Sequence, residues 1–286
     1  MLEQATLTAF ISSALAEDIG NGDHSTLASI PPTARGTARL KIKEDGVLAG
    51  MEVAEAIFRY LDMFTVFRPL KQDGDVMNAG ELAFEVEAAV HTLLMAERLV
   101  LNCMQRMSGI ATLTRQYTDK LKGYHTRVLD TRKTTPNFRM LEKEAVRIGG
   151  GVNHRMGLYD MVMLKDNHID FCGGITPAVN NVVAYLRQKG LDLQIEVEAR
   201  SLEDVKEILA VGQVHRIMLD NFSPEQIPAA LALINGRCET EASGGITLAN
   251  VEAYAKTGVD FVSVGAIIHH AVSLDLSLKA VINPHK

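Results

Sequence analysis

The chain has 286 residues, a length that fits two domains or one large α/β barrel. Hydrophobic residues make up 47% of it and charged residues 22%, proportions that exclude a globally disordered chain. Lysine and arginine number 29 against 35 aspartates and glutamates, and the net charge of −6 argues against non-specific binding of nucleic acid.

The cysteines and the uncharged stretches indicate a cytoplasmic protein. Cys103, Cys172 and Cys238 are widely spaced and form no CxxC pair, which argues against a disulfide framework and for a reducing compartment. The N-terminal residues carry acids where a signal peptide carries bases, and the longest stretch without Asp, Glu, Lys or Arg contains Pro177. We therefore expect neither a targeting signal nor a membrane span.

The first part of the chain, up to about Ala88, mixes helices with short strands. Helices are predicted at Leu7–Glu17 and Met51–Leu61, and strands at Thr37–Lys43, Thr65–Leu70 and Glu81–Val86. Apolar and basic residues alternate along the first strand, which is typical of a half-buried strand. The pattern predicts a small α+β domain with an antiparallel sheet.

A long helical segment comes next. Leucine and methionine recur at helical spacing between His91 and Gly123. We predict a break in this helix at Ser108-Gly109.

From about Thr126 onward, strands and helices alternate. Strands are predicted at Arg127–Leu129, Met161–Leu164, Gln194–Val197, Arg216–Leu219, Cys238–Glu241 and Phe261–Val264. Helices are predicted between most of them, at Leu202–Ala210, Pro224–Ile234 and Leu248–Lys256. This alternation is typical of parallel βαβ units, and six of them fit an α/β barrel better than an open sheet.

The residues that follow these six strands are polar or glycine-rich. In α/β barrels the carboxyl ends of the strands meet at one mouth, where the chemistry takes place. The cationic candidates there are Arg132, Lys133, His154, Arg155 and Lys165, and the anionic ones are Glu198 and Asp220. Such a mixture suits an anionic substrate whose phosphates also bind a hard divalent cation such as Mg²⁺. Glu196 shares a strand face with Glu198, and only one of them need be a ligand.

A phosphate cradle is predicted near the end of this region. Ser243-Gly244-Gly245 follows a strand and precedes a helix, so its backbone N–H groups can face an anion. Gly265 follows the next strand, and barrels often bind phosphate between their last strands. Three consecutive glycines, Gly149–Gly151, favour a close approach of backbone to a ligand as much as a plain linker.

Several motifs together resemble those of the quinolinate phosphoribosyltransferase family. They are Glu97-Arg98, Leu101-Asn102, Ser108–Thr112, DTRKTTP (130–136), GGGVNHR (149–155), KDNHI (165–169), EVE (196–198), LDN (219–221) and EASGGI (241–246). The likeness runs from Glu17-Asp18 to Leu274-Asp275, and DTRKTTP and GGGVNHR are highly specific in combination.

The resemblance implies an N-terminal α/β sandwich followed by an incomplete α/β barrel of about six parallel strands. The implied boundaries are 1–110 for the sandwich and 111–270 for the barrel, with a tail of about 271–286 that packs back on the first domain. The implied unit is a homodimer with no nucleic-acid or membrane partner. The implied reaction is a pentosyl transfer in NAD biosynthesis, which converts quinolinate and phosphoribosyl pyrophosphate with Mg²⁺ to nicotinate mononucleotide, CO₂ and pyrophosphate.

The resemblance also implies roles for individual residues. Arg132, His154, Arg155 and Lys165 surround the quinolinate carboxylates, with Arg98 supplied by the partner subunit, and Thr131 lies beside them. Lys133, Glu198 and Asp220 are the implied catalytic residues and hold the phosphoribosyl pyrophosphate and its metal, which the two acids bind directly or through water or phosphate. The implied 5′-phosphate cradle comprises Ser243, Gly244, Gly245, Gly265, Ala266 and Ile267, with His269 nearby.

Two positions depart from the family pattern, and two other functions stay open. Asn137 stands where glycine is common, and Ile268-His269 replaces the usual Thr-His.

A Schiff-base aldolase or lyase would use Lys133 or Lys165 as its nucleophile and would be trapped by borohydride. A relative of the molybdate-transport type would bind an anion other than quinolinate, but the set of Arg98, Arg132, Arg155 and Lys165 favours quinolinate. His168 is expected to support the site rather than to bind substrate.

Overall fold

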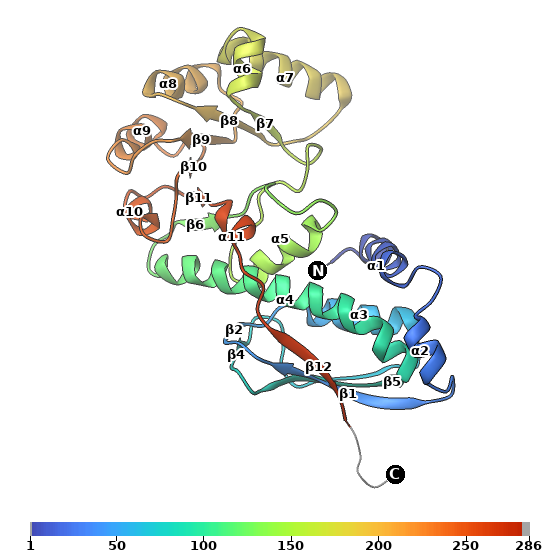
Figure 1. Cartoon of the computed structure of the whole chain (residues 1–286). Helices are drawn as coiled ribbons and strands as arrows, with labels where there is room; N and C mark the ends of the chain where they lie inside the picture. The colour runs from blue at the N-terminus through green and yellow to red at the C-terminus, as the bar shows by residue number, and fades with distance from the viewer. Residues whose placement is uncertain (1, 282–286) are drawn as a thin grey trace. The chain divides into compact units, whose positions relative to one another are not determined.

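The computed structural model describes residues 2–281, which fall into two compact units (Figure 1). Within the described residues, the first unit takes the chain as far as Arg115, then Thr134–Gly150, and the chain from Ile268 onward. The second unit comprises Gln116–Lys133 and Gly151–Ile267.

The first unit contains a four-stranded antiparallel sheet, as the sequence predicted. Its order is β12 (Leu276–Ala280), β1 (Arg35–Ile42), β5 (Leu82–Ala89), β3 (Val66–Pro69), and a short pair of β2 (Gly46–Val47) and β4 (Val76–Met77) lies apart from it. The alternation along β1 buries one face, and Leu40 lies opposite Leu278 on one side and Phe84 on the other. Part of the predicted tail thus forms the edge strand β12, and residues 282–286 lie outside the described residues.

Several helices accompany this sheet in the first unit. They are α1 (Gln4–Ile19), α2 (His24–Ser29), α3 (Met51–Leu61), α5 (Arg139–Ile148) and most of α4 (Val90–Lys120). On α3, Phe58 is fully buried, and its ring meets that of Phe84 edge to face at a centroid distance of 6.1 Å. The structure confirms the predicted bounds of α3.

The predicted break at Ser108-Gly109 is wrong, because α4 runs through both residues. Gly109 is small for a packing reason: a Cβ there would lie 2.0 Å from the carbonyl oxygen of Val272. The hydroxyl of Ser108 accepts a hydrogen bond from the backbone N–H of Ala49 at 3.0 Å. These small residues admit neighbouring backbone while the helix stays continuous.

The second unit contains a six-stranded sheet, and all of its strand pairs are parallel. Its order is β6 (Arg127–Leu129), β11 (Phe261–Ser263), β10 (Glu239–Ser243), β9 (Arg216–Asp220), β8 (Ile195–Ala199), β7 (Val162–Leu164). Among the described strands, β6 and β7 end the sheet without pairing to each other. The sheet therefore matches the predicted incomplete barrel.

Helices connect most successive strands of this sheet, as a parallel arrangement requires. They are α6 (Asp166–Cys172), α7 (Ile175–Lys189), α8 (Leu202–Val211), α9 (Ile227–Ile234), α10 (Val251–Ala255), and the short α11 (Ala266–His269) that follows β11. Among the residues that the structure describes, no helix is both long and apolar enough to cross a membrane.

Candidate active site

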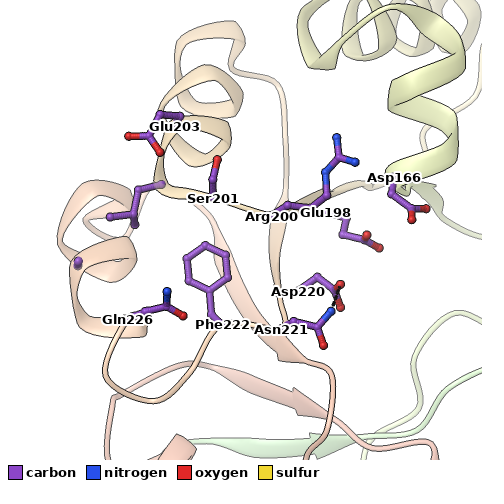
Figure 2. A pocket seen from close by; sticks show the side chains of 11 residues that line it. Asp166, Glu198, Arg200, Ser201, Glu203, Asp220, Asn221, Phe222 and Gln226 are labelled. Carbon is purple, nitrogen blue, oxygen red and sulfur yellow. Dashed lines mark hydrogen bonds between the residues drawn. The ribbon is translucent and has the colours of Figure 1, made fainter.

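The carboxyl ends of β8 and β9 open into a cavity of about 780 Å³ in the second unit. Asp166, Glu198 and Asp220 line it, and Figure 2 shows their side chains at one end of the cavity. The other lining residues come from the segments that lead into α8 and α9. The structure thus brings together the two acids that the sequence singled out, and adds Asp166 to them.

The carboxylates in this cavity repel one another. Burial raises the pKa of Glu198, and the charges of Asp220 and Asp166 raise it further, while Lys165 opposes them. A cation that binds here relieves this repulsion. Carboxylate oxygens are the ligands that Mg²⁺ prefers, so Glu198 and Asp220 are the described residues best suited to hold it.

The predicted cradle residues adjoin this cluster. Ser243 ends β10 directly opposite Asp220 of β9, and its hydroxyl donates a hydrogen bond of 2.6 Å to Asp220 Oδ1. Gly244 and Gly245 follow with φ of 91° and 63°, in the left-handed region that favours glycine. The backbone of this turn therefore takes a conformation that other residues rarely adopt.

The cationic residues of the second unit lie after β6 and around β7. Thr131, Arg132 and Lys133 follow β6, and the backbone N–H of Lys133 donates to the hydroxyl of Thr131 at 3.1 Å. Burial lowers the pKa of Arg155, and the positive charge of Arg132 lowers it further. An anion with two carboxylates would relieve this repulsion between like charges.

Lys165 and His168 lie at the start of α6. The side chain of Lys165 is exposed, and its backbone N–H donates to Nδ1 of His168 at 3.1 Å. His168 therefore stabilises the turn from β7 into α6. That His168 supports the site rather than binding substrate stays a prediction.

His154 belongs to a buried cluster of charged side chains in the second unit. We name it the barrel cluster, and it comprises His154, Glu196, Arg216 and Glu241. Nε2 of His154 lies 3.0 Å from Glu196 and 3.3 Å from Glu241. Arg216 completes the cluster, with a guanidinium nitrogen 3.3 Å from Glu241. The His154 side chain is only 4% exposed, so its ring is directed at these carboxylates.

The charges of the barrel cluster balance when it holds one proton. Burial opposes a charge on His154, but its contacts with Glu196 and Glu241 prevail and raise its pKa to about 9. Burial and Glu241 raise the pKa of Glu196. Arg216 offsets one buried negative charge, and a proton shared between His154 and Glu196 offsets the other.

The barrel cluster also has the composition of a metal site. His154, Glu196 and Glu241 offer ligand atoms that all lie within 4.8 Å of one another. A metal ion there would meet the positive charge of Arg216, which already contacts Glu241. We therefore regard the cluster as a support for the GGGVNHR segment, and Glu198 with Asp220 as the better metal ligands.

The remaining predicted residues occupy other places. Arg98 is an exposed side chain on α4 in the first unit. Gly265, Ala266 and the fully buried Ile267 follow β11 in the second unit, whereas His269 falls in the first unit, with its ring 4.3 Å from that of His270. Asn137 has a φ of 61°, a conformation that glycine adopts freely and that asparagine tolerates better than most residues.

The sequence reasoning missed several residues of this site. Asp166 stands within the KDNHI motif but was not selected, and Asn221 follows Asp220 directly. Arg216 and Glu241 are the clearest omissions, because a charged residue inside a buried parallel strand is itself an unusual signal. That signal would have identified the barrel cluster as a feature to explain.

Comparisons with known proteins agree with this geometry. The family model of the quinolinate phosphoribosyl transferase N-terminal domain matches residues 23–108, and that of the C-terminal domain matches residues 110–279. A chloroplastic nicotinate-nucleotide pyrophosphorylase [carboxylating] of Arabidopsis thaliana is 46% identical, covering 96% of this chain and 82% of that protein.

A bacterial relative and a solved structure are similar over at least nine tenths of their length. A probable nicotinate-nucleotide pyrophosphorylase [carboxylating] of Synechocystis is 47% identical, covering 94% of this chain and 90% of that protein. The crystal structure of NadC from Streptococcus pyogenes superposes with a TM-score of 0.91 at 40% identity, covering 99% of each chain. The chain belongs to the quinolinate phosphoribosyl transferase family.

Proposed function

We propose that this protein is a carboxylating nicotinate-nucleotide pyrophosphorylase of NAD biosynthesis. It transfers the phosphoribosyl group of phosphoribosyl pyrophosphate to the ring nitrogen of quinolinate, and releases pyrophosphate and CO₂. The observation that carries the proposal is the arrangement of the family motifs in the second unit. Arg132 follows β6 and Arg155 precedes β7, while Glu198 and Asp220 lie at the carboxyl ends of β8 and β9 and line one cavity.

Quinolinate is a dianion, and its burial without partners would be very costly. Arg132 and Arg155 repel each other in the free protein, so a dicarboxylate between them gains two charge-assisted partners. Lys165 adds a third positive charge from the start of α6. These groups fix the orientation of the ring, so that its nitrogen faces the ribose carbon that leaves pyrophosphate.

Glu198 and Asp220 act on phosphoribosyl pyrophosphate. The ribosyl carbon becomes positively charged as pyrophosphate departs, and Glu198 or Asp220 stabilises that charge. Lys133 neutralises the departing pyrophosphate. Once the ring nitrogen is ribosylated, the positively charged ring stabilises the electron pair of the C2–carboxylate bond as CO₂ leaves, and C2 then takes up a proton from water. No covalent intermediate with the protein is required, which separates this proposal from a Schiff-base mechanism.

We include Mg²⁺ in this proposal, held by Glu198 and Asp220 directly or through water and substrate phosphate. The support is the donor set: two oxygen-bearing acids whose mutual repulsion raises the pKa of one of them. When bound, the ion supplies positive charge to the pyrophosphate.

We also propose that the protein acts as a cytoplasmic homodimer in which Arg98 reaches the active site of the neighbouring subunit. The exposure of Arg98 on α4 supports this role, and the three free cysteines fit a reducing compartment. A mixture of Arg98→Ala and Lys133→Ala subunits tests the dimer. Hybrid dimers then regain activity that neither variant has alone, whereas no recovery would contradict a site shared between subunits.

The experiment for the reaction is a turnover assay with phosphoribosyl pyrophosphate and Mg²⁺, with quinolinate or nicotinate as the acceptor. We expect nicotinate mononucleotide from quinolinate and none from nicotinate, because Arg132 and Arg155 together require a second carboxylate. Product from neither acceptor, with a folded dimer, would reject the proposal in favour of an anion-binding relative that does not use pyridines.

A further inference from the structure

Asp220 is one of the two proposed metal ligands, and each of its carboxylate oxygens accepts a hydrogen bond from a neighbouring side chain. The hydroxyl of Ser243 donates to Oδ1 at 2.6 Å. The side-chain amide of Asn221 donates to Oδ2 at 2.6 Å, and Figure 2 shows the side chains of Asn221 and Asp220 next to each other. Each carboxylate oxygen has capacity for further partners. Two fixed donors therefore orient the carboxylate while leaving lone pairs available to a ligand in the cavity.

Asn221 is itself held in an uncommon backbone conformation. Its φ is 56°, and its backbone N–H donates to the carbonyl oxygen of Ser243 at 2.9 Å. The left-handed conformation at the end of β9 places the amide next to the carboxylate of the preceding residue. Asparagine and glycine tolerate this conformation best, but only asparagine supplies an amide donor.

The same side chain lies against the proposed phosphate cradle. A Cβ added to Gly244 would lie 2.1 Å from Oδ1 of Asn221 and 2.8 Å from its Cγ. The space that Gly244 leaves is therefore the space that the Asn221 amide needs. Asn221 and Ser243 thus connect the metal-binding side of the cavity with the turn at 243–245.

We propose that Asn221 and Ser243 are positioning residues that act through Asp220, so that the hydroxyl of Ser243 serves the metal side of the site and not the 5′-phosphate. The proposal rests on the proposed function, because it takes Mg²⁺ with phosphoribosyl pyrophosphate as the ligand of Asp220. It changes the role of Ser243 that the family resemblance implied. It also assigns a role to Asn221, which that resemblance left without one.

The test compares Asn221→Gly and Ser243→Ala with the wild type by calorimetric titration. Glycine keeps the left-handed backbone at position 221 and removes only the amide. Asn235→Gly is the matched control, because Asn235 is an exposed asparagine with a φ of 48° at the end of α9. The two probes are phosphoribosyl pyrophosphate with Mg²⁺, and ribose 5-phosphate, which carries the 5′-phosphate but no pyrophosphate.

For each site variant we expect the affinity for phosphoribosyl pyrophosphate with Mg²⁺ to fall about tenfold, the effect of one hydrogen bond to a charged group. The Mg²⁺ concentration for half-maximal binding should rise, while the affinity for ribose 5-phosphate should match that of Asn235→Gly. An equal loss for both probes would overturn the proposal, because Ser243 or Asn221 would then serve the phosphate. Unchanged binding of both probes would overturn it as well.

The outcome for the wild type separates this inference from the proposed function. If the wild-type protein fails to bind phosphoribosyl pyrophosphate with Mg²⁺, the proposed function fails. If the wild type binds phosphoribosyl pyrophosphate with Mg²⁺, and Asn221→Gly and Ser243→Ala bind it as tightly as Asn235→Gly does, the positioning role fails and the proposed function stands. Melting temperatures equal to that of Asn235→Gly exclude a general loss of structure in the variants.

Discussion

The two sheets differ in the side chains that their strands bury. In the first unit, the sheet and α3 enclose apolar side chains, and Leu40, Phe58 and Phe84 are each fully buried. In the second unit, the interior strands β8, β9 and β10 contribute Glu196, Arg216 and Glu241 to a buried cluster of charges. The described strands of the four-stranded sheet bury apolar side chains, although α5 of the same unit buries Glu142 and Lys143, and Glu142 pairs with Arg106 at 2.8 Å. The parallel sheet of the second unit instead buries charged side chains on its own strands, beneath the ends that carry the proposed chemistry.

Apolar and charged interiors respond differently to substitution. An apolar interior tolerates exchange of similar side chains, because burial is not directional. A buried group of charges depends on every member, because the loss of one leaves another unpaired. Substitutions on the buried strands of the two sheets should therefore have effects of very different size.

The largest effect on stability is expected for Arg216→Met. This change removes the positive charge that faces Glu196 and Glu241, and it should lower the free energy of unfolding by about 3–5 kcal/mol. Leu40→Met, in the interior of the first unit, should cost less than about 1.5 kcal/mol. Urea unfolding of both variants measures the difference, and equal costs would contradict the contrast between the two interiors.

The largest effect on activity without loss of stability is expected for Lys133→Ala. Lys133 is exposed, so its removal should leave the melting temperature nearly unchanged. The turnover number should fall about 100-fold, as when a group that stabilises transition-state charge is removed. Lys206→Ala is the matched control, because Lys206 is an exposed lysine on α8. Parallel losses of turnover and stability in Lys133→Ala would count against a catalytic role.

A smaller effect is expected from the protonation of Glu198. Its pKa in the folded protein is raised above 4.5, so protonation of Glu198 favours the folded state. This contribution to the free energy of unfolding is fully present below pH 4.5 and is lost as the pH rises through the raised pKa. Binding of Mg²⁺ with phosphoribosyl pyrophosphate should reverse this and release a proton in the range between 4.5 and the raised pKa. Calorimetry in two buffers of different ionisation enthalpy measures the release.

Glu198→Gln provides the comparison for this proton. The variant has no carboxylate to titrate at that position, so the component of proton release due to Glu198 should disappear. Persistence of the full release in Glu198→Gln would assign the proton to another group.

The smallest effect is expected for Arg39→Gln on the surface of the first unit. Arg39 donates to Glu85 at 2.8 Å across neighbouring strands, but its side chain is 47% exposed. Exposed pairs of this kind contribute less than about 1 kcal/mol, so the urea midpoint should hardly move. A cost as large as that of Arg216→Met would show that exposure does not distinguish the two ion pairs.

The periodic parts of the fold were predictable because each followed from a local pattern. The alternation of β1 and the apolar spacing of α3 are visible in the sequence, and the structure agrees with both. Ser108-Gly109 misled the prediction, since small residues permit close packing as readily as they break a helix. The partner that explains Gly109 is Val272, which lies far away in sequence.

The candidate site was predictable to a similar degree, through its strand ends. Glu198 and Asp220 follow or end buried strands, so their convergence followed from the parallel arrangement. The surroundings of His154 were not predictable, because they depend on Glu196 and Glu241 from separate strands. The link between Asn221 and Asp220 depends on a left-handed backbone at one residue, which the sequence indicates only weakly.

The central claim is that the second unit decarboxylates quinolinate after it attaches the phosphoribosyl group. The most direct measurement follows quinolinate labelled at the 2-carboxyl carbon, with phosphoribosyl pyrophosphate and Mg²⁺ present. We predict one labelled CO₂ for each nicotinate mononucleotide, and no labelled CO₂ without phosphoribosyl pyrophosphate. Quinolinate labelled instead at the 3-carboxyl carbon should release no label. Labelled CO₂ without phosphoribosyl pyrophosphate, or nicotinate mononucleotide without labelled CO₂, would contradict the central claim.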